Sequence, residues 1–91
     1  MSARPTTIQK RTIWNHLLGT KQQGRCCFCL QKFDRHQLTL EHIQPLSLGG
    51  TNAIPNFDMS CTICNNERGV QDFAGFRQQK WFGSVGSNAQ F

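Results

Sequence analysis

The sequence has no long apolar run and few acidic residues. No segment approaches the roughly 18 consecutive apolar residues of a membrane-spanning helix. The first seven residues include Arg4 and Pro5 and contain no apolar stretch of the kind found in a signal peptide. There is also no internal repeat and no low-complexity block. We therefore expect no membrane association and a cytoplasmic location, where cysteine thiols stay reduced.

The chain is too short to build a large core. Its 91 residues predict a single domain, and 37% of them are hydrophobic. The mean hydropathy is −0.48. A domain of this size buries only roughly 60–65% of the surface that its unfolded chain exposes. We therefore expect an additional staple such as a disulfide, a metal ion or a partner.

Basic residues outnumber acidic ones by two to one. Ten lysines and arginines stand against five aspartates and glutamates, which gives a net charge of +5, and the isoelectric point is near 9.3. Such a balance suits a polyanionic partner, but it also suits ordinary solubility charge. Charge alone therefore supports a nucleic-acid function without establishing one.

Local patterns predict helices at both ends. Thr6 and Gln9 form a capping box before an apolar face, which predicts a helix over about residues 6–19. A second helix is predicted over about residues 70–82, and the glycine- and serine-rich segment 83–91 is predicted to be a loose tail.

The sequence contains two C-x-x-C pairs, which are typical of zinc sites. A two-residue spacer lets two sulfurs face one point, and two such pairs complete the tetrahedron that Zn²⁺ prefers. A Cys₄ set leaves no open position, so this zinc is expected to be structural. The alternative is four buried or redox-active cysteines, and Cys27 is interpreted as a spare buried thiol. The predicted ligands are Cys26, Cys29, Cys61 and Cys64.

The segment between the pairs, residues 30–60, exceeds the roughly 15–20 residues of a compact zinc ribbon. It reads EHIQP at 41–45, then a glycine pair at 49–50, then Asn56, and the second pair continues as CTICNNERG at 61–69. In order and spacing, this pattern resembles the HNH endonuclease family from Cys26 to Gly69. The resemblance implies an α+β fold: a ββα-metal (HNH, or His-Me finger) core over about residues 25–69, held by the Cys₄ zinc and flanked by helices.

The resemblance also implies roles for individual residues. His42 takes the place of the general base and Glu41 that of an aspartate metal ligand, although its side chain is one methylene longer. Asn56 corresponds to the asparagine that braces the loop. Asn65 takes the position of a second metal ligand, for which Asn66 is a competing candidate. These roles predict a metal-dependent DNA endonuclease that leaves 5′-phosphate and 3′-hydroxyl ends.

The residue types suit this chemistry. Histidine has an unperturbed pKa near 6.5, so its neutral form accepts a proton from water at about neutral pH. A carboxylate and an amide offer hard oxygen ligands, which favours Mg²⁺ or Mn²⁺ at the catalytic site. Taken singly, each residue also has a structural interpretation, such as a core histidine or a turn asparagine.

The expected substrate is double-stranded DNA, which the protein is expected to contact through the phosphate backbone. No segment resembles a base-reading helix, so we expect low sequence specificity, and one site per chain predicts nicking. The oligomeric state is left open.

The sequence also permits two alternative functions. One is a non-catalytic zinc module that binds nucleic acid, and the other is a zinc-stapled protein-interaction module with an exposed aromatic patch. The predicted phosphate-binding residues are Arg35, Arg68, Arg77 and Lys80.

Overall fold

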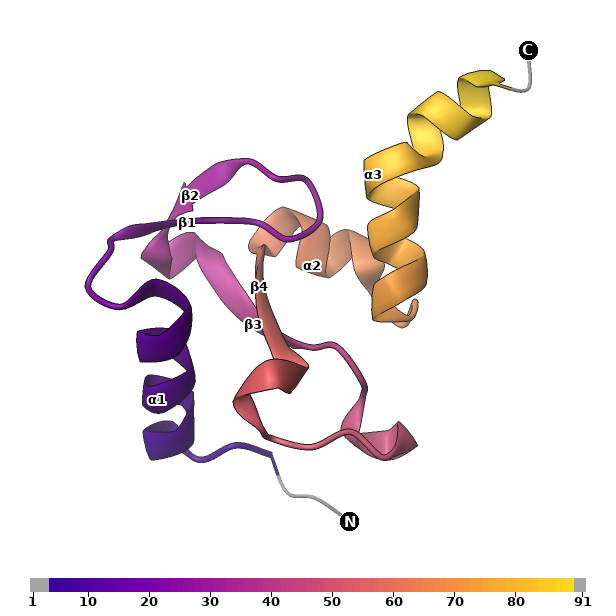
Figure 1. Cartoon of the computed structure of the whole chain (residues 1–91). Coiled ribbons are helices and arrows are strands. Elements are labelled where there is room, and N and C mark those ends of the chain that lie inside the picture. Colours follow the sequence, from indigo (N-terminus) through magenta and orange to yellow (C-terminus); the bar gives the residue numbers. More distant parts are fainter. Residues whose placement is uncertain (1–3, 90–91) are drawn as a thin grey trace.

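The computed structural model describes residues 4–89, and side chains as far as residue 82. Figure 1 shows two small antiparallel hairpins between an N-terminal and a C-terminal helix. No helix in this part of the chain is long and apolar enough to cross a membrane. In chain order, the elements are α1 (Thr7–Leu18), β1 (Gln23–Arg25), β2 (Lys32–Asp34), β3 (Leu38–His42), β4 (Phe57–Cys61), α2 (Thr62–Arg68) and α3 (Phe73–Ala89).

Helix α1 begins as its capping box predicts. The Thr6 hydroxyl accepts a hydrogen bond from the Gln9 amide, and the Gln9 side chain accepts one from the Thr6 amide. Ile13 and Leu18 are the buried residues of this helix. The helix ends at Gly19, whose φ of 61° favours glycine. The predicted N-terminal helix is thus present with bounds one residue inside those expected.

The first hairpin, β1 and β2, closes around the C-x-x-C turn. Leu30 adopts a φ of 66°, and its amide donates to the Cys26 carbonyl. Gly24 in β1 is buried, and a Cβ there would lie 2.7 Å from Leu18 and 2.8 Å from Met59. Glycine therefore lets α1 and β4 approach the first hairpin closely.

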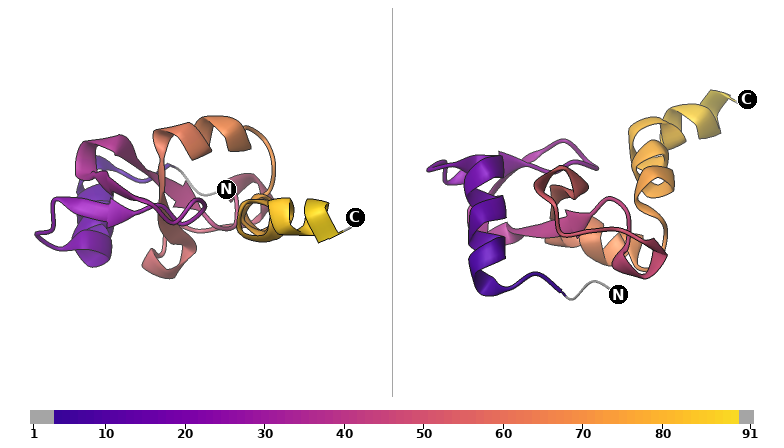
Figure 2. Two further views of the ribbon diagram at one scale, coloured as in Figure 1. Left: turned by 90° about the horizontal axis from the view of Figure 1, so that it is seen from above. Right: turned by 60° about the horizontal axis from the view of Figure 1, so that its bottom comes forward.

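The second hairpin and α2 form the ββα unit. β3 pairs antiparallel with β4, so that Leu38 lies opposite Cys61 and His42 lies opposite Phe57. Because α2 follows β4 without a loop, the chain turns directly from the strand into the helix. In both views of Figure 2 this unit lies between α1 and α3. The predicted α+β class, with a ββα core flanked by helices, is confirmed.

A small aromatic cluster attaches α3 to this core. Phe28, which is 0% exposed, contacts Phe73 and Phe76, with ring centroids 5.0 Å and 4.9 Å away. The four cysteines of the two C-x-x-C pairs pack against the same cluster. Beyond these first turns, α3 extends away from the body of the molecule (Figure 1).

The predicted bounds of the C-terminal helix are wrong at both ends. α3 begins at Phe73, because Gly69 turns left-handed after α2 and the Asp72 carboxylate then caps the new helix at the Gly75 amide. It continues to Ala89, through most of the segment predicted to be a loose tail. A glycine within a helix costs about 1 kcal/mol relative to alanine, so it weakens the helix without necessarily ending it. Residues 90–91 lie outside the described part.

Replacement of Phe28 by alanine should test the attachment of α3. We expect Phe28→Ala to lower the free energy of unfolding by about 3–5 kcal/mol, since it leaves a cavity among buried rings. The matched control is Phe82→Ala, because Phe82 is 58% exposed. Urea unfolding of the zinc-loaded protein measures both changes. Equal losses in the two variants would contradict this account of the core.

Candidate functional site

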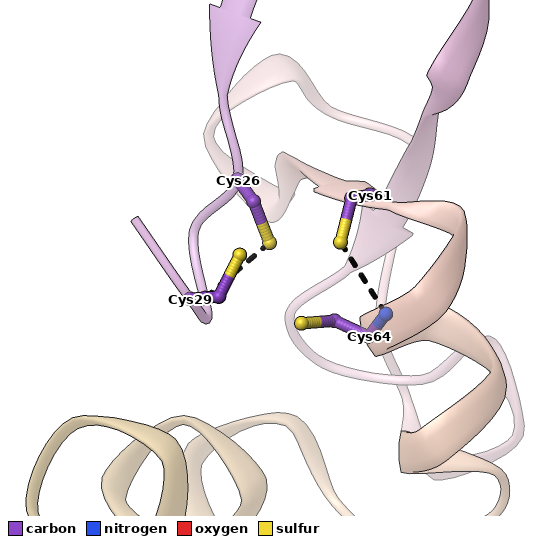
Figure 3. A group of neighbouring side chains, drawn as sticks. All are labelled: Cys26, Cys29, Cys61 and Cys64. Atoms are coloured by element: carbon purple, nitrogen blue, oxygen red, sulfur yellow. Dashed lines mark hydrogen bonds between the residues drawn. The ribbon is translucent and has the colours of Figure 1, made fainter. Parts of the chain in front are cut away.

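The two C-x-x-C pairs meet in space. Figure 3 shows one pair in the turn after β1 and the other at the junction of β4 and α2, with the sulfurs directed toward a common centre. Their four sulfur atoms lie within 4.8 Å of one another. A tetrahedral ion with Zn–S bonds of about 2.3 Å needs sulfurs about 3.8 Å apart, which is close to this arrangement. The four cysteines are thus positioned to bind a metal ion, consistent with structural zinc.

Backbone amides stabilise the sulfurs of this cluster. The amides of Phe28 and Cys29 lie 3.3 Å and 3.4 Å from the Cys26 sulfur, and the Cys64 amide lies 3.4 Å from the Cys61 sulfur. Although burial acts to raise it, the pKa of Cys26 lies below its ordinary value because backbone N–H groups donate to the sulfur. Burial, followed by the neighbouring sulfurs, raises the pKa of Cys64. A bound cation would compensate this repulsion between thiolates.

Cys27 lies outside the cluster. Its amide donates to the Met59 carbonyl, and its carbonyl accepts a 3.1 Å hydrogen bond from the indole of Trp81. Burial and then the nearby charge of Asp58 raise the pKa of Cys27. A neutral buried thiol is a poor metal ligand and a poor nucleophile.

His42 ends β3 with its imidazole held on two sides. Its ring packs against Phe57, with centroids 4.4 Å apart. Its Nε2 lies 2.9 Å from Oδ1 of Asn52. An amide oxygen only accepts hydrogen bonds, so in this contact the imidazole donates from Nε2, and Nδ1 takes no part in it. The imidazole is therefore held in one orientation by Phe57 and Asn52.

Asn56 shapes the loop between β3 and β4. Its Oδ1 accepts from the Gln44 amide, and its Nδ2 donates to the carbonyls of Gln44 and Thr51. Gly50 permits the same fold of the loop, since a Cβ there would lie 1.9 Å from the Gln44 carbonyl oxygen. The loop that carries Asn52 toward His42 is thus braced by side-chain bonds to its backbone.

Glu41 is buried in a polar network below the strand surface. Its side chain is 2% exposed, Oε2 accepts a 2.6 Å hydrogen bond from the Ser60 hydroxyl, and Oε1 lies 2.6 Å from a guanidinium nitrogen of Arg68. Thr39 joins the network through a 3.2 Å contact between the hydroxyls of Thr39 and Ser60. Ionised carboxylates remain buried only when they are paired in this way.

One broad hollow brings the main predicted residues together. β3 pairs only with β4, and the hollow follows β3 from α1 at one end to α2 at the other. Glu41, His42, Asn65 and Arg68 all line it. Asn66 is exposed and does not line it, while Asn56 lies in the supporting loop.

The predicted phosphate-binding residues all have partners within the chain. Arg68 pairs with Glu41, and Lys80 lies 3.0 Å from Glu67, whose hydrogen bond raises the pKa of Lys80. Arg35 donates to the carbonyls of Gly19 and Lys21. The guanidinium of Arg77 lies 5.1 Å from the ring centroids of both Phe73 and Trp81. Among these four, only Arg68 lines the hollow.

Two residues that contact the predicted site residues were not predicted from the sequence. Asn52 contacts His42, and Ser60 contacts Glu41. Asn52 follows a glycine pair and resembles any turn asparagine, while Ser60 precedes a cysteine and resembles any strand serine. The antiparallel register, which places Ser60 opposite Thr39, brings Ser60 to Glu41, whereas the folded loop between β3 and β4 brings Asn52 to His42.

Comparison with known proteins identifies one related family. The family described as HNH endonuclease matches residues 26–80, which is more than half of the chain. The match spans both cysteine pairs, the ββα unit and the start of α3, and it leaves α1 outside. Neither a curated protein nor a solved structure matches the chain significantly.

Serine substitution should separate the metal ligands from the fifth cysteine. We expect Cys61→Ser to lose bound zinc and to melt cooperatively only at much lower temperature, because metal binding is coupled to folding. Cys27→Ser removes an equally small buried thiol outside the cluster and should retain one zinc per chain. Elemental analysis and thermal unfolding measure both properties. Zinc loss from Cys27→Ser with retention in Cys61→Ser would reverse the assignment.

Removal of Arg68 should expose the cost of burying Glu41. Arg68→Ala leaves a buried carboxylate without its cation, so we expect the free energy of unfolding to fall by about 3 kcal/mol. Lys80→Ala breaks the more exposed ion pair with Glu67 and should cost about 0–1 kcal/mol. Chemical unfolding of both variants tests the difference, and equal small effects would mean that the Glu41–Arg68 pair contributes little.

Proposed function

This chain belongs to the HNH endonuclease family, and from that premise we propose that it hydrolyses DNA phosphodiester bonds with His42 as the general base. The observation that carries the proposal is the 2.9 Å contact between His42 Nε2 and Asn52 Oδ1, at the edge of the hollow lined by Glu41 and Asn65. It supports an imidazole that is held through Nε2, so that Nδ1 would be the nitrogen that accepts the proton.

His42 would act on a water molecule beside the scissile phosphorus. As Nδ1 takes a proton from the water, the water oxygen forms a bond to phosphorus and the bond from phosphorus to the 3′ oxygen breaks. The products then carry a 5′-phosphate and, after the leaving oxygen gains a proton, a 3′-hydroxyl. Asn52 and Phe57 hold the imidazole in one orientation, which lowers the entropy lost on reaching the transition state.

The donor set suits a divalent cation such as Mg²⁺ or Mn²⁺. Glu41 supplies a carboxylate and Asn65 an amide oxygen, both at the same hollow, and such hard oxygens are the ligands these ions prefer. When bound, the cation supplies charge neutralisation for the phosphate and the leaving oxygen. Ser60 and Arg68 hold the Glu41 carboxylate in place, and a bound cation would share this carboxylate with both of them.

Nicking with low sequence specificity is the expected mode on double-stranded DNA. The chain carries one His42 site, and the hollow offers cationic side chains suited to phosphate contacts, which carry no sequence information. Five free cysteines further support action in a reducing compartment such as the cytoplasm.

A second function is favoured by one observation. Glu41 is 2% exposed and both of its oxygens already accept hydrogen bonds, so its network also serves a purely structural role. In that case the chain would be a zinc-stabilised module that binds nucleic acid without cleaving it.

Plasmid cleavage tests the catalytic proposal. The zinc-loaded protein with Mg²⁺ or Mn²⁺ should convert supercoiled plasmid to open circles. His42→Ala should reduce the rate by about 10²–10⁴-fold, the usual contribution of a general base. The matched control is His36→Ala, since His36 is exposed and outside the hollow. Omission of the divalent metal should also stop cleavage, and linear product would indicate paired cutting.

Intact plasmid in every metal, from folded and zinc-loaded protein, would refute the nuclease proposal and leave the binding module. Equal activity of the His42→Ala variant would instead refute the role of His42 as base.

A further inference from the structure

The charge of the chain is unevenly divided. Residues 1–33 contain six of the ten lysines and arginines and no aspartate or glutamate, a net charge of +6. Residues 34–91 contain the other four basic residues and all five acidic ones, a net charge of −1. The HNH match covers only the last part of the basic segment, from Cys26 on. The long-range attraction for a polyanion therefore originates mainly in the N-terminal third.

The basic residues after position 33 are already engaged within the protein. Arg35, Arg68, Arg77 and Lys80 make the carbonyl, carboxylate and ring contacts described above. By contrast, Arg4 and Lys10 form no ion pair and no side-chain hydrogen bond with the residues whose side chains the structure describes, and both are exposed. Their charge is free to meet a ligand from solution.

These two cations lie beside the candidate active site. The hollow lined by Glu41, His42 and Asn65 is lined at its other end by Arg4, Pro5, Lys10 and Trp14. The segment before α1 and one face of α1 thus form a wall of the hollow. Figure 1 shows α1 standing to one side of β3 and β4, with α2 on the other side. Half-buried Trp14 adds an apolar surface to this wall.

We infer that this N-terminal wall, made of Arg4, Pro5, Lys10 and Trp14, binds the DNA backbone next to the bond that is cut. The inference rests on the proposed function, because it takes the occupant of the hollow to be DNA. The Lys10 ammonium and the Arg4 guanidinium contact phosphates on one side of the scissile phosphate. Trp14 packs against the sugar of the same strand. The wall lies outside the matched family region, so it is an addition of this chain to the family core.

The N-terminal wall lengthens the DNA-binding site on one side of the scissile phosphate, and its charged side chains contact only phosphates. Each phosphate neutralised by a cation releases counterions, which steepens the negative slope of log K against log salt by about 0.9. The wall therefore contributes affinity and strand placement without sequence preference. It also explains how a core region with a net charge near zero can hold a polyanion beside His42.

Binding of a labelled 20-base-pair duplex tests the wall. The parent protein is the full zinc-loaded chain with His42→Ala, so that the duplex stays intact, and fluorescence anisotropy is followed over a series of salt concentrations. We expect Arg4→Gln with Lys10→Gln to weaken binding roughly tenfold near 0.1 M salt and to reduce the salt slope by about 2.

The matched control removes the same charge elsewhere. Lys21→Gln with Lys32→Gln neutralises two exposed cations that line a different hollow. It should change the affinity less than twofold and leave the salt slope nearly unchanged. Circular dichroism and zinc content check that every variant is folded.

Three results would overturn the inference: equal weakening by both pairs, which means diffuse attraction; unchanged binding by the Arg4 and Lys10 pair; or no duplex binding by the parent at low salt. Failure of the proposed function is recognised separately. If wild-type protein leaves plasmid intact but duplex binding depends on Arg4 and Lys10, the wall stands and the protein binds DNA without cutting it.

Discussion

The meeting of four cysteine sulfurs is the constraint on which the rest of the structure depends. It joins the turn after β1 to the junction of β4 and α2, two segments separated by the whole β3 strand and its loop. The same cysteines pack on the aromatic cluster that holds the first turns of α3. A chain of this size buries little apolar surface, whereas zinc bound by four thiolates can stabilise a fold by about 10–16 kcal/mol. The cluster thereby fixes where α2 begins.

The position of α2 in turn decides the environment of Glu41. Arg68 near the end of α2 reaches the Glu41 carboxylate, and Ser60 on β4 reaches its second oxygen. His42, the next residue on β3, depends on the loop between β3 and β4, which Asn56 braces and from which Asn52 contacts the imidazole. Two adjacent residues of one strand thus depend on two different supports: the metal-stapled helix and the hydrogen-bonded loop.

The basic residues are also divided between two parts of the chain. The basic residues after position 33 contact groups within the protein: Arg68 pairs with buried Glu41, Lys80 pairs with exposed Glu67, and Arg77 packs on aromatic rings. The N-terminal third contains six basic residues and no acidic ones, and Arg4 and Lys10 in this segment form no ion pair with the described residues. The part of the chain from residue 34 on is thus nearly neutral, and the excess positive charge lies in the N-terminal third.

The sequence by itself determined the cysteine pairs, the capping box of α1 and the order of the HNH pattern, because these signals depend on residue type and local spacing. The α+β class followed from the resemblance of that pattern to the HNH family. The sequence did not determine the bounds of α3, since glycine disfavours a helix without ending it unless the backbone turns left-handed, as it does at Gly69. Nor did it reveal the burial of Glu41, the Asn52 contact with His42, or the internal partners of the cations expected to bind phosphate. Those features arise from strand register and helix placement, which bring together residues up to 27 positions apart. Only the tertiary structure decided them, because the free energy of a buried charge depends on which groups surround it.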